Sequence, residues 1–121
     1  MYKIIKKKNY SLHIFEKINK LISIKRIFFL EASHKCVSGS HAHKKCTQVL
    51  FHIRGKINVE IFNGKRTFFK QLSKKKKFII IKPRTWISLN LKKNDICMVL
   101  CDRKYESRDY IYSKNQLLKS S

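Results

Sequence analysis

Two histidines separated by one residue, His41 and His43, are the side chains of this sequence best suited to chemistry. Residues two apart on a β-strand point to the same face of the sheet, so the spacing predicts that the two imidazoles project side by side. Imidazole titrates near neutral pH and serves as either general acid or general base. The pair therefore indicates proton transfer, and the competing interpretation is that both are ordinary histidines of a β-barrel.

The residues that follow extend this pattern. Four residues separate His43 from Gln48, and six separate Gln48 from Gly55. A His-x-His pair with this spacing resembles the first sequence motif of the cupins, which are small antiparallel β-barrels. We therefore expect a barrel whose pocket is built around His41 and His43, with Gln48 on the next strand.

The same motif argues against a bound metal ion. Metal-binding cupins have a Glu where this chain has Gln48, and a third His where its second motif, residues 82–87, has Ile87. Two imidazoles without that carboxylate and third His fall short of a three- or four-ligand site. We expect no metal and no other cofactor. The less favoured alternative is a metal site with four ligands: His41, His43, Cys36 and Cys46.

The elements that must position these residues are short strands separated by turns. β-Branched and aromatic residues mark the strands. The predicted strands are Ile24–Leu30, Gln48–Arg54, Lys56–Phe62, one that begins at Thr67, Phe78–Ile81, Trp86–Leu91 and Ile96–Cys101. Ser38–Ser40 is predicted to be a turn, and Asn63-Gly64 a type I′ hairpin turn, in which both central residues need positive φ. Many short strands without βαβ alternation predict one all-β, antiparallel domain over residues 1–121, a jelly-roll barrel of the cupin type.

The two ends of the chain are less regular. Residues 1–23 carry apolar positions that lean towards helical spacing, although a strand leading into the barrel fits as well. The polar tail from Tyr105 is expected to pack along the barrel edge and to form a short helix at Asn115–Leu118.

The amino-acid composition limits the binding partners and the cellular compartment that we expect for this chain. The chain has 29 Lys and Arg against 7 Asp and Glu, a net charge of +22 that attracts anions of any kind. We expect most of these cations to lie on solvated surface and nucleic acid not to be the partner, because no basic helix is interleaved with stacking aromatics. Four cysteines without a C-x-x-C pair or a secretory signal indicate reduced thiols in a cytoplasm. No apolar run approaches the roughly 18 to 20 residues of a membrane span, so no span is expected.

Further motifs lie on both sides of the histidines. These pieces are Lys25-Arg26 with Phe28-Phe29, the run from Gly39 to Lys45 with Gln48, Pro83 with Trp86, Val99-Leu100, Tyr105, and Asp109-Tyr110-Ile111. Together they resemble the nucleotide-sugar 3,4-ketoisomerases of the cupin superfamily, the WxcM-like C-terminal domains that act on dTDP-4-oxo-6-deoxyglucose. The resemblance is strongest over residues 25–111.

The resemblance implies a metal-free isomerase, a homodimer that exchanges N-terminal strands, and a dTDP-linked keto sugar bound inside the barrel. It implies that His41 and His43 shuttle protons through an enediol and move the ketone from C4 to C3, in amino-sugar biosynthesis for a bacterial surface glycan such as lipopolysaccharide. The residues expected to bind the substrate are Arg26, Phe29, Lys44, Gln48, Arg54 and Trp86. For Trp86, a place in the barrel core is the competing interpretation.

Two positions depart from the family pattern. Ser38 stands where the family has Arg, and Phe29 where it has Tyr. Loss of an Arg removes a bidentate partner for phosphate or an oxyanion, and loss of a phenol removes a hydrogen-bond donor. The alternative function is therefore a catalytically weakened or silent cupin that binds a sugar nucleotide without turnover.

Overall fold

Nearly all regular structure in the computed structural model, which describes residues 1–119, is β-strand. The strands are β1 (Tyr2–Lys6), β2 (Ser11–Phe15), β3 (Arg26–Glu31), β4 (Cys36–His43), β5 (Gln48–Arg54), β6 (Ile57–Phe62), β7 (Thr67–Leu72), β8 (Phe78–Ile81), β9 (Trp86–Leu91), β10 (Ile96–Cys101) and β11 (Tyr110–Ile111). The helical elements are the 3₁₀ turns η1 (Ile18–Lys20) and η2 (Ser107–Asp109) and the helix α1 (Lys114–Lys119). None of these helices is long and apolar enough to cross a membrane.

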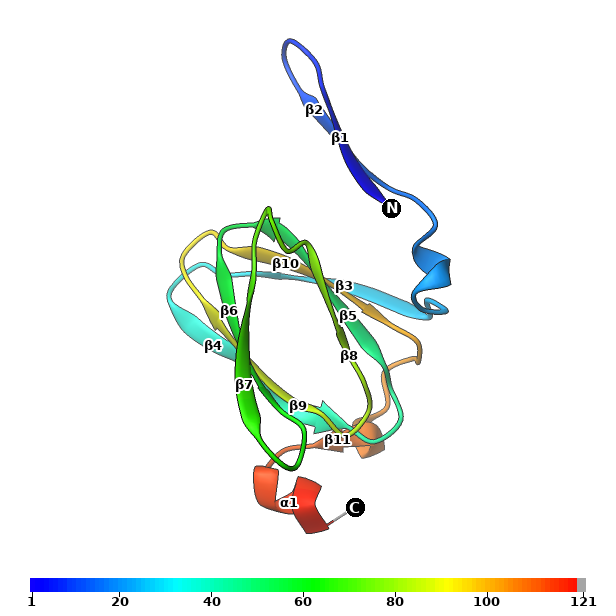
Figure 1. The fold of residues 1–121 in the computed structure, drawn as a ribbon, viewed down its shortest axis with the longest axis vertical. Helices are drawn as coiled ribbons and strands as arrows, with labels where there is room; N and C mark the ends of the chain where they lie inside the picture. The colour runs from blue at the N-terminus through cyan, green and yellow to red at the C-terminus, as the bar shows by residue number, and fades with distance from the viewer. Residues whose placement is uncertain (120–121) are drawn as a thin grey trace.

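The strands form two facing antiparallel sheets that close into a jelly-roll barrel of the cupin type (Figure 1). One sheet has the order β3-β10-β5-β8, and the other has the order β11-β4-β9-β6-β7. The predicted all-β, antiparallel class is confirmed. Four predicted strands, β5, β8, β9 and β10, have the predicted bounds.

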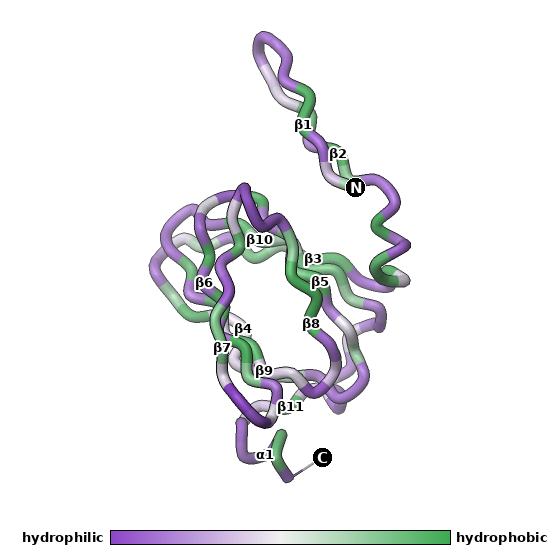
Figure 2. Tube along the Cα trace, in the orientation of Figure 1, coloured by the Kyte–Doolittle hydropathy of each residue, from purple (hydrophilic) through white to green (hydrophobic). Residues whose placement is uncertain are grey.

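The main core lies between the two sheets. Apolar side chains alternate with polar ones along β6, where Ile57, Val59 and Ile61 are buried. They pack with residues of the opposite sheet such as Leu50 and Val99. Each fully buried aliphatic side chain contributes about 1.5–3 kcal/mol to folding. Figure 2 shows this apolar character along the barrel strands and hydrophilic residues at the turns.

The N-terminal segment is a β-hairpin followed by a stretch that packs against the outside of the barrel. β1 and β2 pair and project away from the barrel (Figure 1), so the helical spacing of residues 1–23 does not produce a helix there. Phe15 at the base of the hairpin and Ile22 after it pack on the outer face of the four-stranded sheet, against Phe51 and its neighbours. The rings of Phe15 and Phe51 meet edge to face, with centroids 5.2 Å apart. The apolar periodicity therefore reflects contact with a sheet rather than a helix face.

The C-terminal tail follows the barrel edge, as predicted. β11 pairs with β4, and α1 adds Leu117 to a small cluster on the outside of the barrel. This cluster also contains Ala42, Trp86 and Ile111.

Two predicted turns differ from the structure. Ser38–Ser40 lies inside β4 as a β-bulge rather than a turn. The β6–β7 connection spans residues 63–66, and Gly64 has positive φ while Asn63 does not. The side-chain oxygen of Asn63 accepts hydrogen bonds from the backbone N–H groups of Lys65 and Arg66, which supports a longer loop than the type I′ turn.

Candidate active site

A one-residue bulge in β4 sets which way the two histidines point. The register with β9 shifts between Gly39 and His41, and φ is +83° at Gly39 and +56° at Ser40. An extra residue reverses the inward and outward alternation of a strand. Ser38, His41 and His43 consequently face the inside of the barrel, while Ala42 packs outside.

His41 and His43 lie side by side, as their spacing predicts. Their ring centroids are 5.0 Å apart at an interplanar angle of 61°. His43 is buried and His41 is half-buried. His41 lines a cavity of about 110 Å³, whose walls also include Phe28, Gln48 and Ile87.

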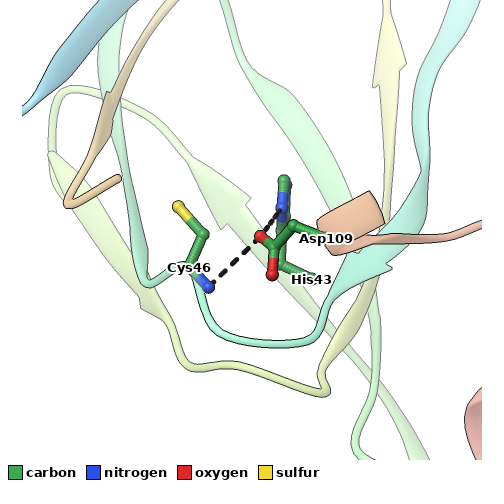
Figure 3. A group of neighbouring side chains, drawn as sticks. All are labelled: His43, Cys46 and Asp109. Atoms are coloured by element: carbon green, nitrogen blue, oxygen red, sulfur yellow. Dashed lines mark hydrogen bonds and ion pairs between the residues drawn. The ribbon is translucent and has the colours of Figure 1, made fainter. Parts of the chain in front are cut away.

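Asp109 holds one of these rings in place (Figure 3). His43 Nδ1 lies 2.8 Å from Asp109 Oδ2, and the backbone N–H of Lys45 donates to Oδ1 at 2.7 Å. Burial acts to raise the pKa of Asp109, but the hydrogen bonds from His43 and the backbone outweigh it and hold that pKa below its usual value. An ionised carboxylate accepts hydrogen bonds only, so Nδ1 of His43 carries the proton.

The opposite nitrogen of His43 is left available. His43 Nε2 is buried and has no hydrogen-bond partner among residues 1–119. Burial lowers the pKa of His43, although its hydrogen bond to Asp109 opposes this shift. Burial also lowers the pKa of His41, and the neighbouring His43 adds to the effect. Both rings are therefore neutral near pH 7, and Nε2 of His43 presents a free lone pair.

Tyr110 and Arg26 complete the polar cluster. The Tyr110 ring centroid lies 4.9 Å from that of His41 and 4.4 Å from that of His43. Arg26 Nη1 donates to the Tyr110 hydroxyl at 3.4 Å. The guanidinium also lies over the Phe28 ring, 4.7 Å from its centroid. This places a cation and a phenol beside the two imidazoles.

Gln48 faces this cluster from the other sheet. Cys101 pairs with Gln48 on one side and with Arg26 on the other, so the three side chains form one row across β3, β10 and β5. Gln48 is buried and donates from Nε2 to Cys101 Sγ at 3.4 Å. Gln48 lines the cavity, and Arg26 lies in the same row beside Tyr110. The predicted contacts of these two residues with a substrate stay predictions.

Four residues predicted to bind substrate lie elsewhere. Phe29 is 60% exposed on the outer face of β3, because inward and outward residues alternate there and Phe28 takes the cavity side. Trp86 is buried in the outer cluster with Leu117, since Ile87 occupies the cavity side of β9. Neither ring lines the cavity, so the two predicted cavity contacts are corrected. Trp86 is buried, as the competing interpretation expects, but in the apolar cluster outside the barrel rather than in the barrel core.

The other two predicted substrate-binding residues, the cations Lys44 and Arg54, also lie away from the cavity around His41. Lys44 is exposed and borders a surface depression with Glu106 and Arg108, because its side chain points away from the barrel. Arg54 is exposed at the far end of β5 from Gln48. Neither belongs to the cavity lining around His41.

Asp109 and Tyr110 are site residues that only the family resemblance, and no periodicity of the sequence, indicates. Their role depends on the pairing of β11 with β4. This pairing brings together residues that are far apart in the chain, such as His43 and Asp109. The one sequence signal was the Asp-Tyr-Ile motif itself, since no local periodicity links it to the histidines.

The donor atoms of His43, Cys46 and Asp109 lie within 4.8 Å of one another, which raises the possibility of an ion site (Figure 3). Each donor already has a partner: His43 and Asp109 bind each other, and Cys46 Sγ donates to the Thr47 carbonyl. A hydrogen bond with Cys101 and burial raise the pKa of the Cys46 thiol. The group fits a proton-holding pair better than a cation site. Cys36, a ligand of the alternative metal site, is exposed at the other end of β4.

Solved structures share this architecture. TDP-fucose-3,4-ketoisomerase WlaRA from Campylobacter jejuni has 25% identity and a TM-score of 0.81, with 98% of this chain and 90% of that chain covered. The sugar 3,4-ketoisomerase QdtA from Thermoanaerobacterium thermosaccharolyticum, in complex with TDP, has 24% identity and a TM-score of 0.84 over 98% and 89% of the two chains. A 3,4-ketoisomerase from Helicobacter canadensis has 22% identity and a TM-score of 0.84 over 98% and 92%.

A family model identifies the chain more directly than these structures. No curated protein sequence gives a significant match. The model described as FdtA: WxcM-like, C-terminal matches residues 1–121. The chain, with its paired histidines inside a cupin barrel, therefore belongs to the WxcM-like, C-terminal family.

Proposed function

We propose that this protein is a nucleotide-sugar 3,4-ketoisomerase that converts a dTDP-linked 4-keto-6-deoxyhexose to its 3-keto isomer. The observation that carries the proposal is the His43–Asp109 pair, with a free Nε2 on His43 and a second imidazole 5.0 Å away. The similarity to WlaRA and QdtA supports it, and a histidine mutant of QdtA has been solved in complex with TDP-4-keto-6-deoxyglucose.

The proposed reaction needs only proton transfers. The C4 ketone acidifies the proton on C3. A neutral imidazole removes that proton while the C4 oxygen takes up a proton, which gives an enediol. A proton is then delivered to C4 while the C3 hydroxyl loses its own proton, which leaves the ketone at C3. The sugar gains and loses no electrons overall, so the reaction requires no redox cofactor.

The surroundings of the two histidines suggest a division of these steps. Asp109 stabilises the imidazolium that forms when His43 accepts a proton, as the carboxylate does in a catalytic triad. His41 has no such carboxylate, and burial beside His43 lowers its pKa, so it is neutral at rest and readily gives up any proton that it accepts during the reaction. We assign proton removal to His43 and proton delivery to His41.

Arg26 and Tyr110 fit the negative charge that develops on the sugar oxygens. The Tyr110 hydroxyl accepts a hydrogen bond from Arg26, and this leaves its own proton for an oxygen of the substrate. A donor fixed in advance at such a position typically contributes about 10²–10³ in rate.

The substrate would extend beyond the cavity. A volume of about 110 Å³ is well below the ~300–1,000 Å³ of pockets that enclose whole small molecules. The keto sugar would lie at the histidines and the nucleotide outside the cavity, where the surplus of cations suits a diphosphate.

The proposed assembly is a homodimer with exchanged N-terminal strands. The β1–β2 hairpin projects from its own barrel and exposes Ile4, Ile5 and Leu12 (Figure 1). Ile27 and Phe29 are exposed on the outer face of β3. A second copy would bury these apolar side chains, and Phe29 would be an interface residue.

The proposed setting is a bacterial cytoplasm. The four cysteines are free, as expected for a reducing compartment. The 3-keto product has the carbonyl that an amination step requires, which fits amino-sugar synthesis for a surface glycan.

A sugar-nucleotide-binding cupin without turnover is the second candidate, and Ser38 favours it. Ser38 lines the cavity where the family resemblance expects an Arg, so this chain lacks a cation there. Incubation with dTDP-4-keto-6-deoxyglucose, followed by NMR identification of the sugar, separates the two functions. A 3-keto sugar supports the isomerase, and saturable binding of the substrate without product supports the silent cupin.

A further inference from the structure

A second, larger cavity lies beyond the end of β5 that is farther from Gln48. It has a volume of about 630 Å³ and forms where the turn after β5 meets the loop between β7 and β8. Its lining includes His52, Ile53, Arg54, Lys56, Lys74 and Lys75. It shares no lining residue with the cavity around His41. This volume is within the ~300–1,000 Å³ typical of small-molecule sites.

The lining is strongly cationic. It contains Arg54, Lys56, Lys74 and Lys75 and no carboxylate. Within residues 1–119, no ion pair connects any of these four cations to an acidic side chain. The buried Asp95 lies against Gly55, but it accepts a hydrogen bond from the backbone N–H of Lys92 at 2.7 Å and lies 3.7 Å from the ammonium of that residue. Among residues 1–119, the four cations of the lining therefore have no acidic side chain within ion-pair distance.

A buried histidine ties the two walls of this cavity together. His52 is 2% exposed, and its Nε2 donates to the carbonyl of Gly55 in one wall. Its Nδ1 accepts a hydrogen bond at 3.0 Å from the ammonium of Lys77, which follows the other wall. The backbone N–H of His52 donates to the Lys77 carbonyl at 2.8 Å. These two side-chain contacts indicate that His52 is neutral and carries its proton on Nε2.

The loop that carries Lys74 and Lys75 is also organised. The hydroxyl of Ser73 accepts hydrogen bonds from the backbone N–H groups of Lys75 and Lys76, at 3.2 and 3.3 Å. The backbone N–H of Ser73 donates to the Lys76 carbonyl at 3.0 Å. A loop fixed in this way presents its cations with less loss of conformational freedom on binding.

Besides burial, repulsion among the cations lowers the pKa of Lys77 and of His52. Burial lowers the pKa of Lys77, and the nearby Lys74 lowers it further. Burial also lowers the pKa of His52, and Lys77 and Lys74 act in the same direction against its bond to Gly55. A bound anion would reduce this repulsion, so anion binding in the cavity is electrostatically favourable.

We propose that this cavity is a second binding site, separate from the histidine cavity, for a small metabolite that carries two or more phosphate groups. The cations supply charge-assisted contacts to the phosphate oxygens. The aliphatic stems of the lysines and Ile53 form an apolar wall for the rest of the molecule.

The test uses inorganic pyrophosphate as the probe and isothermal titration calorimetry of the full chain. We expect one site per chain. The double variant Lys74→Glu, Lys75→Glu should weaken binding at least about tenfold, because two favourable charge contacts become repulsive. The matched control is Lys7→Glu, Lys8→Glu, which makes the same change in net charge in the N-terminal hairpin and should change affinity less than about twofold. The ring signals of His52 in NMR spectra should shift on titration.

Three outcomes would overturn the proposal. Equal weakening in the two double variants, or many weak sites, would show attraction to the whole cationic surface. Unchanged His52 signals during saturable binding would place the anion elsewhere. Stronger binding of a single-stranded oligonucleotide that displaces pyrophosphate would identify a nucleic-acid surface instead.

Discussion

His43 Nδ1 and Asp109 Oδ2 lie 2.8 Å apart although the two residues are 66 positions apart in the chain. This contact exists because β11 pairs with β4 at the edge of the five-stranded sheet. It fixes the tautomer of one histidine beside another, and the proposed chemistry follows from that arrangement.

Replacement of Asp109 by Asn tests this contact. The amide is similar in size but carries no charge to stabilise a protonated His43, so we expect kcat/KM to fall by about 10²–10⁴. Glu106→Gln is the control, because Glu106 is an exposed acid of the same loop, and it should leave turnover unchanged. An Asp109→Asn protein that folds and retains full turnover in steady-state assays would exclude the proposed role.

The pH dependence of turnover should reflect Arg26. Burial lowers the pKa of His43 from 6.5, and the positive charge of Arg26 acts in the same direction. A base works only when neutral, so the acid limb of kcat/KM should lie below pH 6.5, and Arg26→Gln should move it to higher pH. Measurement of kcat/KM from about pH 4.5 to 8 decides this, and an acid limb that stays in place or moves downward would contradict it.

Two neighbouring residues of the bulge should respond in opposite directions. Gly39→Ala places a Cβ 3.2 Å from the Ile87 carbonyl oxygen at φ +83°, so it should destabilise the fold by about 1–3 kcal/mol and reduce turnover. Ser40→Gly relieves a positive φ of 56° and should be neutral or stabilising by up to about 1 kcal/mol. Urea unfolding of both variants measures the difference, and equal effects would show that the bulge conformation is not strained.

Trp86 should affect stability rather than substrate affinity. Its indole packs with Ala42, Ile111 and Leu117 outside the barrel. Trp86→Ala should destabilise the fold by about 3–5 kcal/mol, and Trp86→Phe by less, while KM of either folded variant stays close to that of the parent. A large rise in KM for Trp86→Phe at unchanged stability would restore the stacking interpretation.

The strands could be predicted where local patterns decide them. The β-branched and aromatic run at Gln48–Arg54 and the apolar segment Ile96–Cys101 form strands with the predicted bounds. The spacing of His41 and His43 predicts that the two rings share a face, but their inward direction depends on the bulge before them, which the local sequence does not reveal. A bulge depends on pairing with β9, and a local sequence does not contain its partner.

The remaining site could not be predicted because it depends on long-range pairing. Tyr110 meets the histidines only when β11 joins the edge of β4. Phe28 and Phe29 are chemically equivalent in the sequence, and the register of β3 decides which one enters the cavity. The apolar spacing of residues 1–23 leans towards a helix, but β1 and β2 pair as a hairpin, and the residues from Phe15 to Ile24 pack on the barrel, a long-range contact that the spacing does not reveal.

The most direct test of the two-histidine proton shuttle is conversion of dTDP-4-keto-6-deoxyglucose in deuterated buffer, followed by mass spectrometry and NMR of the sugar. We predict a 3-keto product that carries solvent deuterium at C4, and loss of both product and deuterium in His43→Asn. A folded protein that forms neither product nor deuterated sugar at high concentration, or that forms product with no deuterium, would contradict the account.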